Sequence, residues 1–300
     1  MSTVQVPSRE ETLRAADGMV LAVTRFEPPA RVPPLAPVIV AGATAVPRGY
    51  YGRFARFLAG RGHPVTTFDY RGVGGSRPRS LRGFDARMQE WGRLDLEAVL
   101  ARVAAEHPDT PPLLVGHSVG GQILPLAPSA DRLAAVLLVA SQSGAARHWR
   151  GLDRLRLAAF WYAAVPLLTR LHGYLPGYAM GSAPLPAGIA REWARWGRHP
   201  DYILGYHPEL RQRFRDLAMP LRLYSFPDDF YAPRAAAAEL LSWYGGTHRE
   251  HRFVTPAEAG AGAIGHFGFF RDTFAPTLWA EAADWLEARQ ALAPAPVPPG

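Results

Sequence analysis

The segment 116–120, with the sequence GHSVG, places Ser118 between two glycines at a spacing that suits nucleophilic chemistry. The apolar run 113–115 precedes it and a short helical stretch follows it, so we expect Ser118 on a sharp turn from a strand into a helix. Backbone angles at such a turn are strained, and the residues two before and two after the serine must be small. The pattern predicts that Ser118 attacks an acyl carbon, with the N–H of Val119 as one donor to the oxyanion.

A serine nucleophile needs a base, and His266 is the best placed of the ten histidines. It lies between the last expected strand and the last expected helix, in a loop at the carboxyl end of the sheet, where Ser118 also lies. His117 is the neighbour of the serine in the chain, but it cannot turn back toward the serine oxygen in a productive line. We interpret histidines such as His148 and His207 as solvated side chains.

Two adjacent aspartates, Asp228 and Asp229, are candidates for the acid that holds the imidazole in one tautomer. Both follow the expected strand 221–226. We favour Asp229, because it lies four residues before Pro233, which opens an expected helix. We expect the other aspartate, Asp228, to cap that helix or to face solvent.

The second oxyanion donor should come from the loop after the first core strand. Residues 38–41 are an uninterrupted apolar run of the kind found in buried parallel strands. The loop that follows has the sequence AGAT at residues 41–44. We expect the backbone N–H of Ala43 to point at the substrate oxygen.

Strands and helices must alternate to bring these loops together at one edge of a sheet. Asp17-Gly18 predicts a hairpin between two antiparallel strands at the start of the chain. Beyond it, expected strands cover residues 38–41, 65–69, 113–115, 134–140, 221–226 and 251–255, and expected helices cover about 50–61, 85–106, a short stretch after 119, 233–243 and 271–291. This alternation predicts a parallel sheet with helices on both faces.

The alternation breaks between residues 141 and 216, where about three helical stretches rich in Trp, Tyr and Arg occur without a strand. We expect a helical lid (141–216) inserted between the core segments 1–140 and 217–292, followed by a disordered tail at 293–300. Four aromatic residues of the lid are expected to line an apolar substrate pocket: Trp161, Tyr162, Trp193 and Trp196. The alternative is that these rings only pack the lid on the core.

Together these segments resemble the α/β-hydrolase superfamily, and they are similar to its serine-aminopeptidase-like and lysophospholipase-like branches and to a group of bacterial hydrolases. The resemblance covers about residues 15–291, apart from the lid. It implies the α/β-hydrolase fold: a mostly parallel central sheet of about eight strands flanked by helices, with the lid after the sixth strand. The order Ser118, Asp229, His266 is that of the superfamily. Ala41 departs from the pattern, because many relatives have a histidine there.

The glycine-rich segment 69–76, with the sequence DYRGVGGS, also looks like a phosphate-binding loop. No Lys-Ser or Lys-Thr pair follows it, so the pattern of a nucleotide P-loop fails. We expect a structural turn packed under the active site.

Composition excludes several other classes of function. The net charge of +7 comes with 33 basic residues, all of them arginine and scattered among acids, so we expect no binding to nucleic acid. The absence of cysteine excludes disulfides and thiolate chemistry. No apolar stretch approaches the roughly 20 residues of a membrane span and the start of the chain is unlike a signal peptide, so we expect a soluble, cytoplasmic protein. The use of arginine without any lysine is typical of a GC-rich genome, so we expect a bacterial source. We expect no metal or organic cofactor.

The leading hypothesis is a serine esterase that cleaves a carboxylic ester of a fairly apolar small molecule through an acyl-enzyme on Ser118. An acyltransferase or an aminopeptidase could use the same three residues, since these enzymes differ in the acceptor or the acyl group. A third class is a non-catalytic ligand-binding protein on the same fold. The sequence does not define the oligomeric state.

Overall fold

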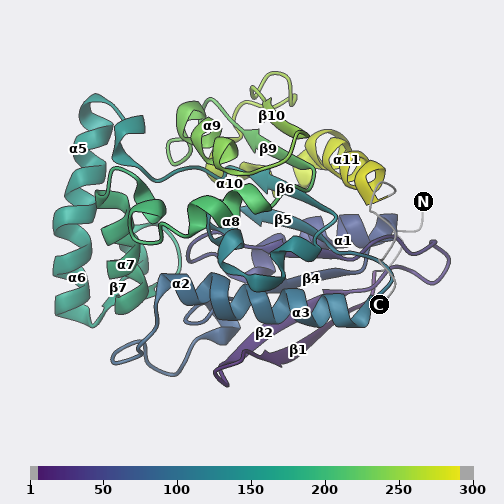
Figure 1. Ribbon diagram of the computed structural model, residues 1–300, viewed down its shortest axis with the longest axis horizontal. Coiled ribbons are helices and arrows are strands. Elements are labelled where there is room, and N and C mark those ends of the chain that lie inside the picture. Colours follow the sequence, from purple (N-terminus) through teal and green to yellow (C-terminus); the bar gives the residue numbers. More distant parts are fainter. Residues whose placement is uncertain (1–5, 291–300) are drawn as a thin grey trace.

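The computed structural model describes residues 6–290. Its centre is an eight-stranded sheet in the order β1-β2-β4-β3-β5-β6-β9-β10 (Figure 1). All neighbours from β4 to β10 run parallel, whereas β2 is antiparallel to both β1 and β4. The strands are β1 (Ser8–Arg14), β2 (Val20–Phe26), β3 (Val38–Ala41), β4 (Val65–Phe68), β5 (Leu113–His117), β6 (Ala135–Val139), β9 (Leu221–Ser225) and β10 (Arg249–Phe253). The mostly parallel sheet of eight strands is confirmed.

Alternation along the central strands explains why helices cover both faces of the sheet. In β3, Val38 and Val40 belong to the apolar cluster formed with α1 (Gly52–Arg61) and α11 (Ala280–Gln290), while Ile39 belongs to the cluster formed with α3 (Glu97–Glu106). Every residue of β3, β5 and β6 is buried. Strands buried on both faces are continuously apolar, as the sequence of β3 is.

The remaining helices are α2 (Met88–Glu90), α4 (Val119–Ile123), α5 (Gly151–Ala159), α6 (Val165–His172), α7 (Ala187–Arg198), α8 (Leu210–Asp216), α9 (Arg234–Trp243) and α10 (Gly265–Gly268). The helix expected at 85–106 begins at Met88 and contains a π-helical turn, Trp91–Leu96, between α2 and α3. Its wider turn holds the buried Asp95, whose carboxylate accepts hydrogen bonds from the backbone and guanidinium of Arg71. The helix expected at 271–291 likewise includes a π-helical turn, Ala275–Trp279, which contains a proline.

Between β6 and β9 the chain forms an insertion (141–216) that comprises α5, α6, α7 and α8. The expectation of no strand here is wrong, because Tyr174–Leu175 (β7) and Leu185–Pro186 (β8) form a short antiparallel pair. Figure 1 shows α5, α6 and α7 gathered at one end of the molecule, beside the sheet. The tail expected to be disordered, 293–300, lies outside the described residues. Within 6–290, no helix has the length and apolarity required to span a bilayer.

Candidate active site

Ser118 lies on the turn between β5 and α4, in a backbone conformation that non-glycine residues rarely adopt, with φ 52° and ψ −111°. The flanking glycines are needed for close packing. A Cβ atom at Gly120 would lie 2.4 Å from the carbonyl oxygen of Ala41, and one at Gly116 would lie 2.9 Å from a methyl of Leu138. The N–H of Val119, the first residue of α4, has no acceptor among the described residues, so it is available to an oxyanion.

His266 lies on the short helix α10, and it lines the same pocket as Ser118. Its Nδ1 is 2.8 Å from Oδ2 of Asp229. Because the carboxylate can only accept, Nδ1–H donates and Nε2 is left free to take a proton. Asp229 is 4% exposed, and its other oxygen, Oδ1, accepts the N–H groups of Tyr231 and Ala232 at 2.8 and 3.0 Å. The carboxylate is therefore held rigidly behind the imidazole.

Asp228 has a different partner from its neighbour. Its Oδ2 accepts the backbone N–H groups of Ile264 and Gly265 at 2.8 and 3.0 Å. Asp228 does not cap α9, but it is exposed, as the alternative expectation has it; its carboxylate is directed toward the backbone just before His266. The two adjacent aspartates thus have different contacts: Asp229 orients the ring of His266, and Asp228 fixes the backbone just before it.

His117 is fully buried and connects two parts of the site. Its Nε2 is 2.9 Å from the backbone carbonyl of His266, and its Nδ1 is 2.9 Å from the hydroxyl of Tyr51. The carbonyl can only accept, so Nε2 carries the hydrogen and Nδ1 accepts from the Tyr51 hydroxyl. Burial, together with the nearby His266, lowers the pKa of His117 well below its usual value. His117 is therefore neutral and in one tautomer.

The backbone N–H of Ala43, the residue expected to supply the second oxyanion donor, is already engaged. It donates to the hydroxyl oxygen of Tyr51 at 2.7 Å. Gly42 allows this approach, because a Cβ atom there would lie 2.9 Å from the Tyr51 ring. The next residue, Thr44, lines the pocket, and its N–H has no acceptor among the described residues. The N–H of Thr44 is thus a free donor of this loop at a residue that lines the cavity.

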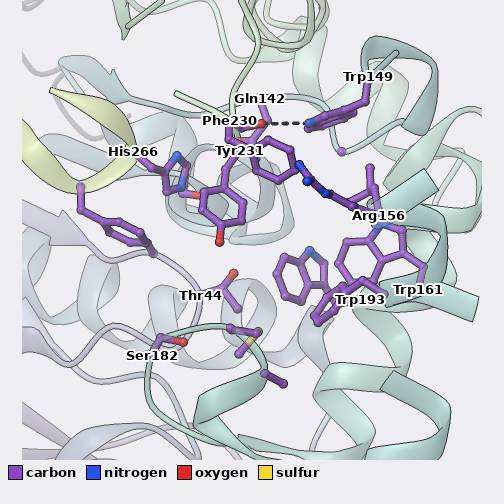
Figure 2. Close-up of a pocket in the computed structure, with 18 of the residues that line it drawn as sticks. Thr44, Gln142, Trp149, Arg156, Trp161, Ser182, Trp193, Phe230, Tyr231 and His266 are labelled. Carbon is purple, nitrogen blue, oxygen red and sulfur yellow. Dashed lines mark hydrogen bonds between the residues drawn. The ribbon is translucent and has the colours of Figure 1, made fainter. Parts of the chain in front are cut away.

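Ser118 and His266 open into a cavity of about 270 Å³ with a predominantly apolar wall that is rich in aromatic rings. In Figure 2, His266 and Tyr231 face Trp161 and Trp193 across the cavity, with Thr44 between them. The insertion supplies the far wall. The lining residues are Ala43, Thr44, Ser118, Gln142, Gly144, Trp149, Arg156, Leu157, Phe160, Trp161, Ala179, Met180, Ser182, Trp193, Tyr202, Phe230, Tyr231, His266 and Phe267.

Of the four aromatic residues expected to bind substrate, Trp161 and Trp193 line the cavity and the other two do not. Tyr162 is 63% exposed and lies under the guanidinium of Arg198 on the outer side of the insertion. Trp196 is fully buried in the core cluster, edge-on to Tyr202. Tyr162 points away because adjacent positions on a helix have different directions, whereas Trp196 packs against Tyr202 in the core, a contact that helical spacing alone does not specify.

Aromatic residues next to Asp229 and His266 also line the cavity, although they were not among the residues expected from the sequence. Phe230 and Tyr231 line the cavity from the loop that carries Asp229, and Phe267 lines it from α10, next to His266. Their positions in the chain were a usable signal, because a side chain that follows a site residue in a loop often shares its cavity.

The segment 69–76 is a structural turn. The carboxylate of Asp69 accepts the backbone N–H groups of Arg48 and Gly75 at 2.6 and 2.8 Å and also pairs with the Arg48 guanidinium. A Cβ atom at Gly74 would lie 2.4 Å from the same carboxylate. The glycines of this segment therefore pack around the carboxylate of Asp69, which is a side chain of the protein itself and not a bound phosphate. Within residues 6–290, no group of three or more His, Asp or Glu side chains is arranged to hold a metal ion.

Comparison with known proteins identifies the fold. Residues 32–177 match the family model described as serine aminopeptidase, S33. Similar solved structures include a soluble variant of monoglyceride lipase from Saccharomyces cerevisiae in complex with a substrate analog (14% identity, 96% of each chain, TM-score 0.69). A second is brefeldin A esterase, a bacterial homologue of human hormone-sensitive lipase (17% identity, 97% of this chain and 80% of that one, TM-score 0.62).

A third is the mouse alpha/beta hydrolase domain-containing protein 10 (15% identity, 95% of this chain and 99% of that one, TM-score 0.57). A search of curated protein sequences found no match. At these identities the structures show a common fold.

Proposed function

We propose that this chain, which has the fold of the α/β-hydrolase superfamily, is a serine hydrolase that cleaves a carboxylic ester of a small, fairly apolar molecule. The observation that carries the proposal is the convergence of Ser118 and His266 on one aromatic cavity, with the buried Asp229 hydrogen-bonded to the histidine. Nucleophile, base and orienting acid then occupy the three roles that acyl transfer to a serine requires.

The reaction begins when Nε2 of His266 takes the proton of the Ser118 hydroxyl as its oxygen attacks the ester carbon. The N–H groups of Val119 and Thr44 donate to the oxyanion that forms. His266 then gives the proton to the leaving alcohol, and the acyl group stays on Ser118. Water, deprotonated by His266, attacks the acyl-enzyme, and the carboxylic acid leaves as the proton returns to Ser118. Throughout, Asp229 holds the imidazole and stabilises its charged form.

The composition of the cavity favours an ester over a peptide. An aminopeptidase has to bind the positively charged amino terminus of its substrate, for which a buried carboxylate is the natural partner. No Asp or Glu occurs among the described residues that line the cavity, and its charged side chain is Arg156. Aromatic rings and a volume of about 270 Å³ suit a compact acyl or aryl group.

The insertion (141–216) acts as the lid in this proposal. It contributes Trp149, Phe160, Trp161 and Trp193 to the wall that faces the triad. Such a wall excludes water while the acyl-enzyme forms. Transfer of the acyl group to an alcohol other than water would use the same lid and triad, so hydrolysis and acyl transfer are separated by the acceptor alone.

The test is a series of nitrophenyl esters from acetate to dodecanoate, run beside aminoacyl nitroanilides. The proposal predicts turnover of esters with an optimum at short or medium chains, and at least 100-fold lower kcat/KM for the anilides. Efficient cleavage of the anilides with poor cleavage of every ester would instead support the aminopeptidase. Ligand binding with no turnover of either series would support the non-catalytic alternative.

A further inference from the structure

Four polar side chains from the core and the insertion form a hydrogen-bonded chain that ends at the cavity. The indole Nε1 of Trp193 is 3.1 Å from the hydroxyl of Tyr202. The same hydroxyl is 2.8 Å from Oε1 of Gln122. Nε2 of Gln122 is in turn 3.2 Å from Oε1 of Gln142. Trp193, Tyr202 and Gln142 line the cavity, whereas Gln122 lies behind them on α4.

The direction of every hydrogen bond in this series of four side chains follows from Trp193, its first member. An indole N–H can only donate, so the Tyr202 oxygen accepts from Trp193 and its own hydrogen is free to donate. The acceptor within reach is Gln122, which must therefore present its carbonyl oxygen to Tyr202 and its NH₂ to Gln142. Gln142 must accept with its carbonyl oxygen, which leaves its NH₂ group directed away from the chain.

The NH₂ group of Gln142 has no acceptor among the described residues, although Gln142 is only 8% exposed and lines the cavity. Its two hydrogens are strong donors, and Gln142 lines a cavity whose other walls are rich in aromatic rings. The site is thus built to receive an acceptor atom.

The position of Tyr202 is fixed by its surroundings. It has a positive φ of 51°, which is unfavourable for a tyrosine. Its ring packs on Gly144, where a Cβ atom would lie 2.3 Å from the ring. Strain and a glycine contact of this kind persist where the rest of the structure determines the conformation. The hydrogen-bonded series of side chains that orients Gln142 is therefore rigid.

We infer that Gln142 is a specificity-determining residue, whose NH₂ group binds an oxygen of the substrate other than the scissile carbonyl, such as a ketone, an ether or a second ester. This inference rests on the proposed function and refines its substrate class. The preferred substrates are apolar esters that carry one hydrogen-bond acceptor, and esters of hydrocarbon chains alone leave the amide unpaired. A neutral hydrogen bond of this kind changes kcat/KM by roughly twofold to tenfold.

The experiment compares pairs of aryl esters matched in chain length, in which one member has a ketone or ether oxygen along the acyl chain, and a second set with that oxygen on the alcohol side. The readout is the ratio of kcat/KM for the oxygenated ester to kcat/KM for its hydrocarbon partner. We expect a ratio of about three to ten for the best pair. Gln142→Met, which keeps the shape and removes the donor, should bring the ratio to about one, and Tyr202→Phe, which breaks the orienting chain, should lower it partly.

Gln212→Met is the matched control, because this exposed glutamine lies on α8 and does not line the cavity; it should keep the wild-type ratio. A ratio near one for every wild-type pair would overturn the inference, as would an equal loss on both members of a pair in Gln142→Met. A binding measurement distinguishes a failure of this inference from a failure of the proposed catalytic function. In Ser118→Ala, tryptophan fluorescence should show tighter binding of the oxygenated esters, and the double variant with Gln142→Met should lose that difference even if no ester is hydrolysed.

Discussion

The imidazole of His117 donates a hydrogen bond from Nε2 to the backbone carbonyl of His266, 2.9 Å away. The residue beside Ser118 thereby holds the main chain at His266. The hydroxyl of Tyr51 completes the connection, since it donates to Nδ1 of His117 and accepts the N–H of Ala43. One buried network thus joins three segments: the loop at Ala43, the turn at Ser118 and the segment that carries His266.

Removing the Tyr51 hydroxyl should weaken this network. Tyr51→Phe leaves the N–H of Ala43 and Nδ1 of His117 without partners in a buried site. We expect a loss of about 1–3 kcal/mol in the free energy of unfolding and a fall of about tenfold in kcat. Denaturant unfolding and steady-state kinetics measure the two effects. Tyr206→Phe, at a partly exposed ring, is the control, and equal behaviour of the two variants would contradict the account.

The buried, neutral state of His117 predicts a pH dependence of stability. Because its folded pKa is depressed, the unfolded chain takes up a proton below a pH of about 6.5 that the folded chain does not. The stabilisation is present above that pH and is lost as the pH falls, by up to about 1.4 kcal/mol per pH unit.

Histidine-selective nitrogen NMR should find His117 as the neutral Nε2–H tautomer down to pH 5. In His117→Gln, the loss of unfolding free energy between pH 7 and pH 5 should be smaller than in the wild type. A His117 resonance that titrates near pH 6.5 would show that the ring is not held in this way.

The two aspartates should differ sharply when each is changed to asparagine. Asp229→Asn removes the acceptor for Nδ1–H of His266 and favours the wrong tautomer, so kcat should fall by about 10⁴-fold. Asp228→Asn keeps an acceptor oxygen for Ile264 and Gly265, and kcat should fall by no more than about tenfold. Nitrophenyl ester kinetics compare the variants. Similar losses in both would mean that the acid has been assigned wrongly.

Trp161 and Tyr162 offer a matched test of the cavity wall. Trp161→Leu enlarges the cavity and should move the preferred ester to a longer acyl chain, whereas Tyr162→Leu changes an exposed ring and should keep the wild-type optimum. The measurement is kcat/KM across the ester series. If Tyr162→Leu shifts the optimum and Trp161→Leu does not, the cavity that binds the acyl group is a different one.

The serine turn and the parallel sheet were predictable because their signals are local. Gly116 and Gly120 flank Ser118 in a short segment, and the apolar run at 38–41 defines a buried strand without reference to any partner. The choice of Asp229 over Asp228 depended on a spacing to Pro233 and agrees with the contact to His266.

Other features depend on how distant segments meet, which local patterns do not specify. The contact of Tyr51 with Ala43 and His117 joins three separate segments, and only the assembled fold shows that the N–H of Ala43 is occupied. The directions of the aromatic side chains in the insertion could not be predicted from the sequence for a related reason. A π-helical turn, Phe160–Ala164, changes the helical phase where Trp161 points inward and Tyr162 points out.

The most direct test of the account is reaction of the purified protein with a fluorophosphonate probe, followed by intact mass and peptide mapping, with Ser118→Ala as the control. We expect one adduct per chain, on Ser118, and no adduct and no ester turnover in Ser118→Ala. Labelling at another residue, or full ester turnover by Ser118→Ala, would contradict it.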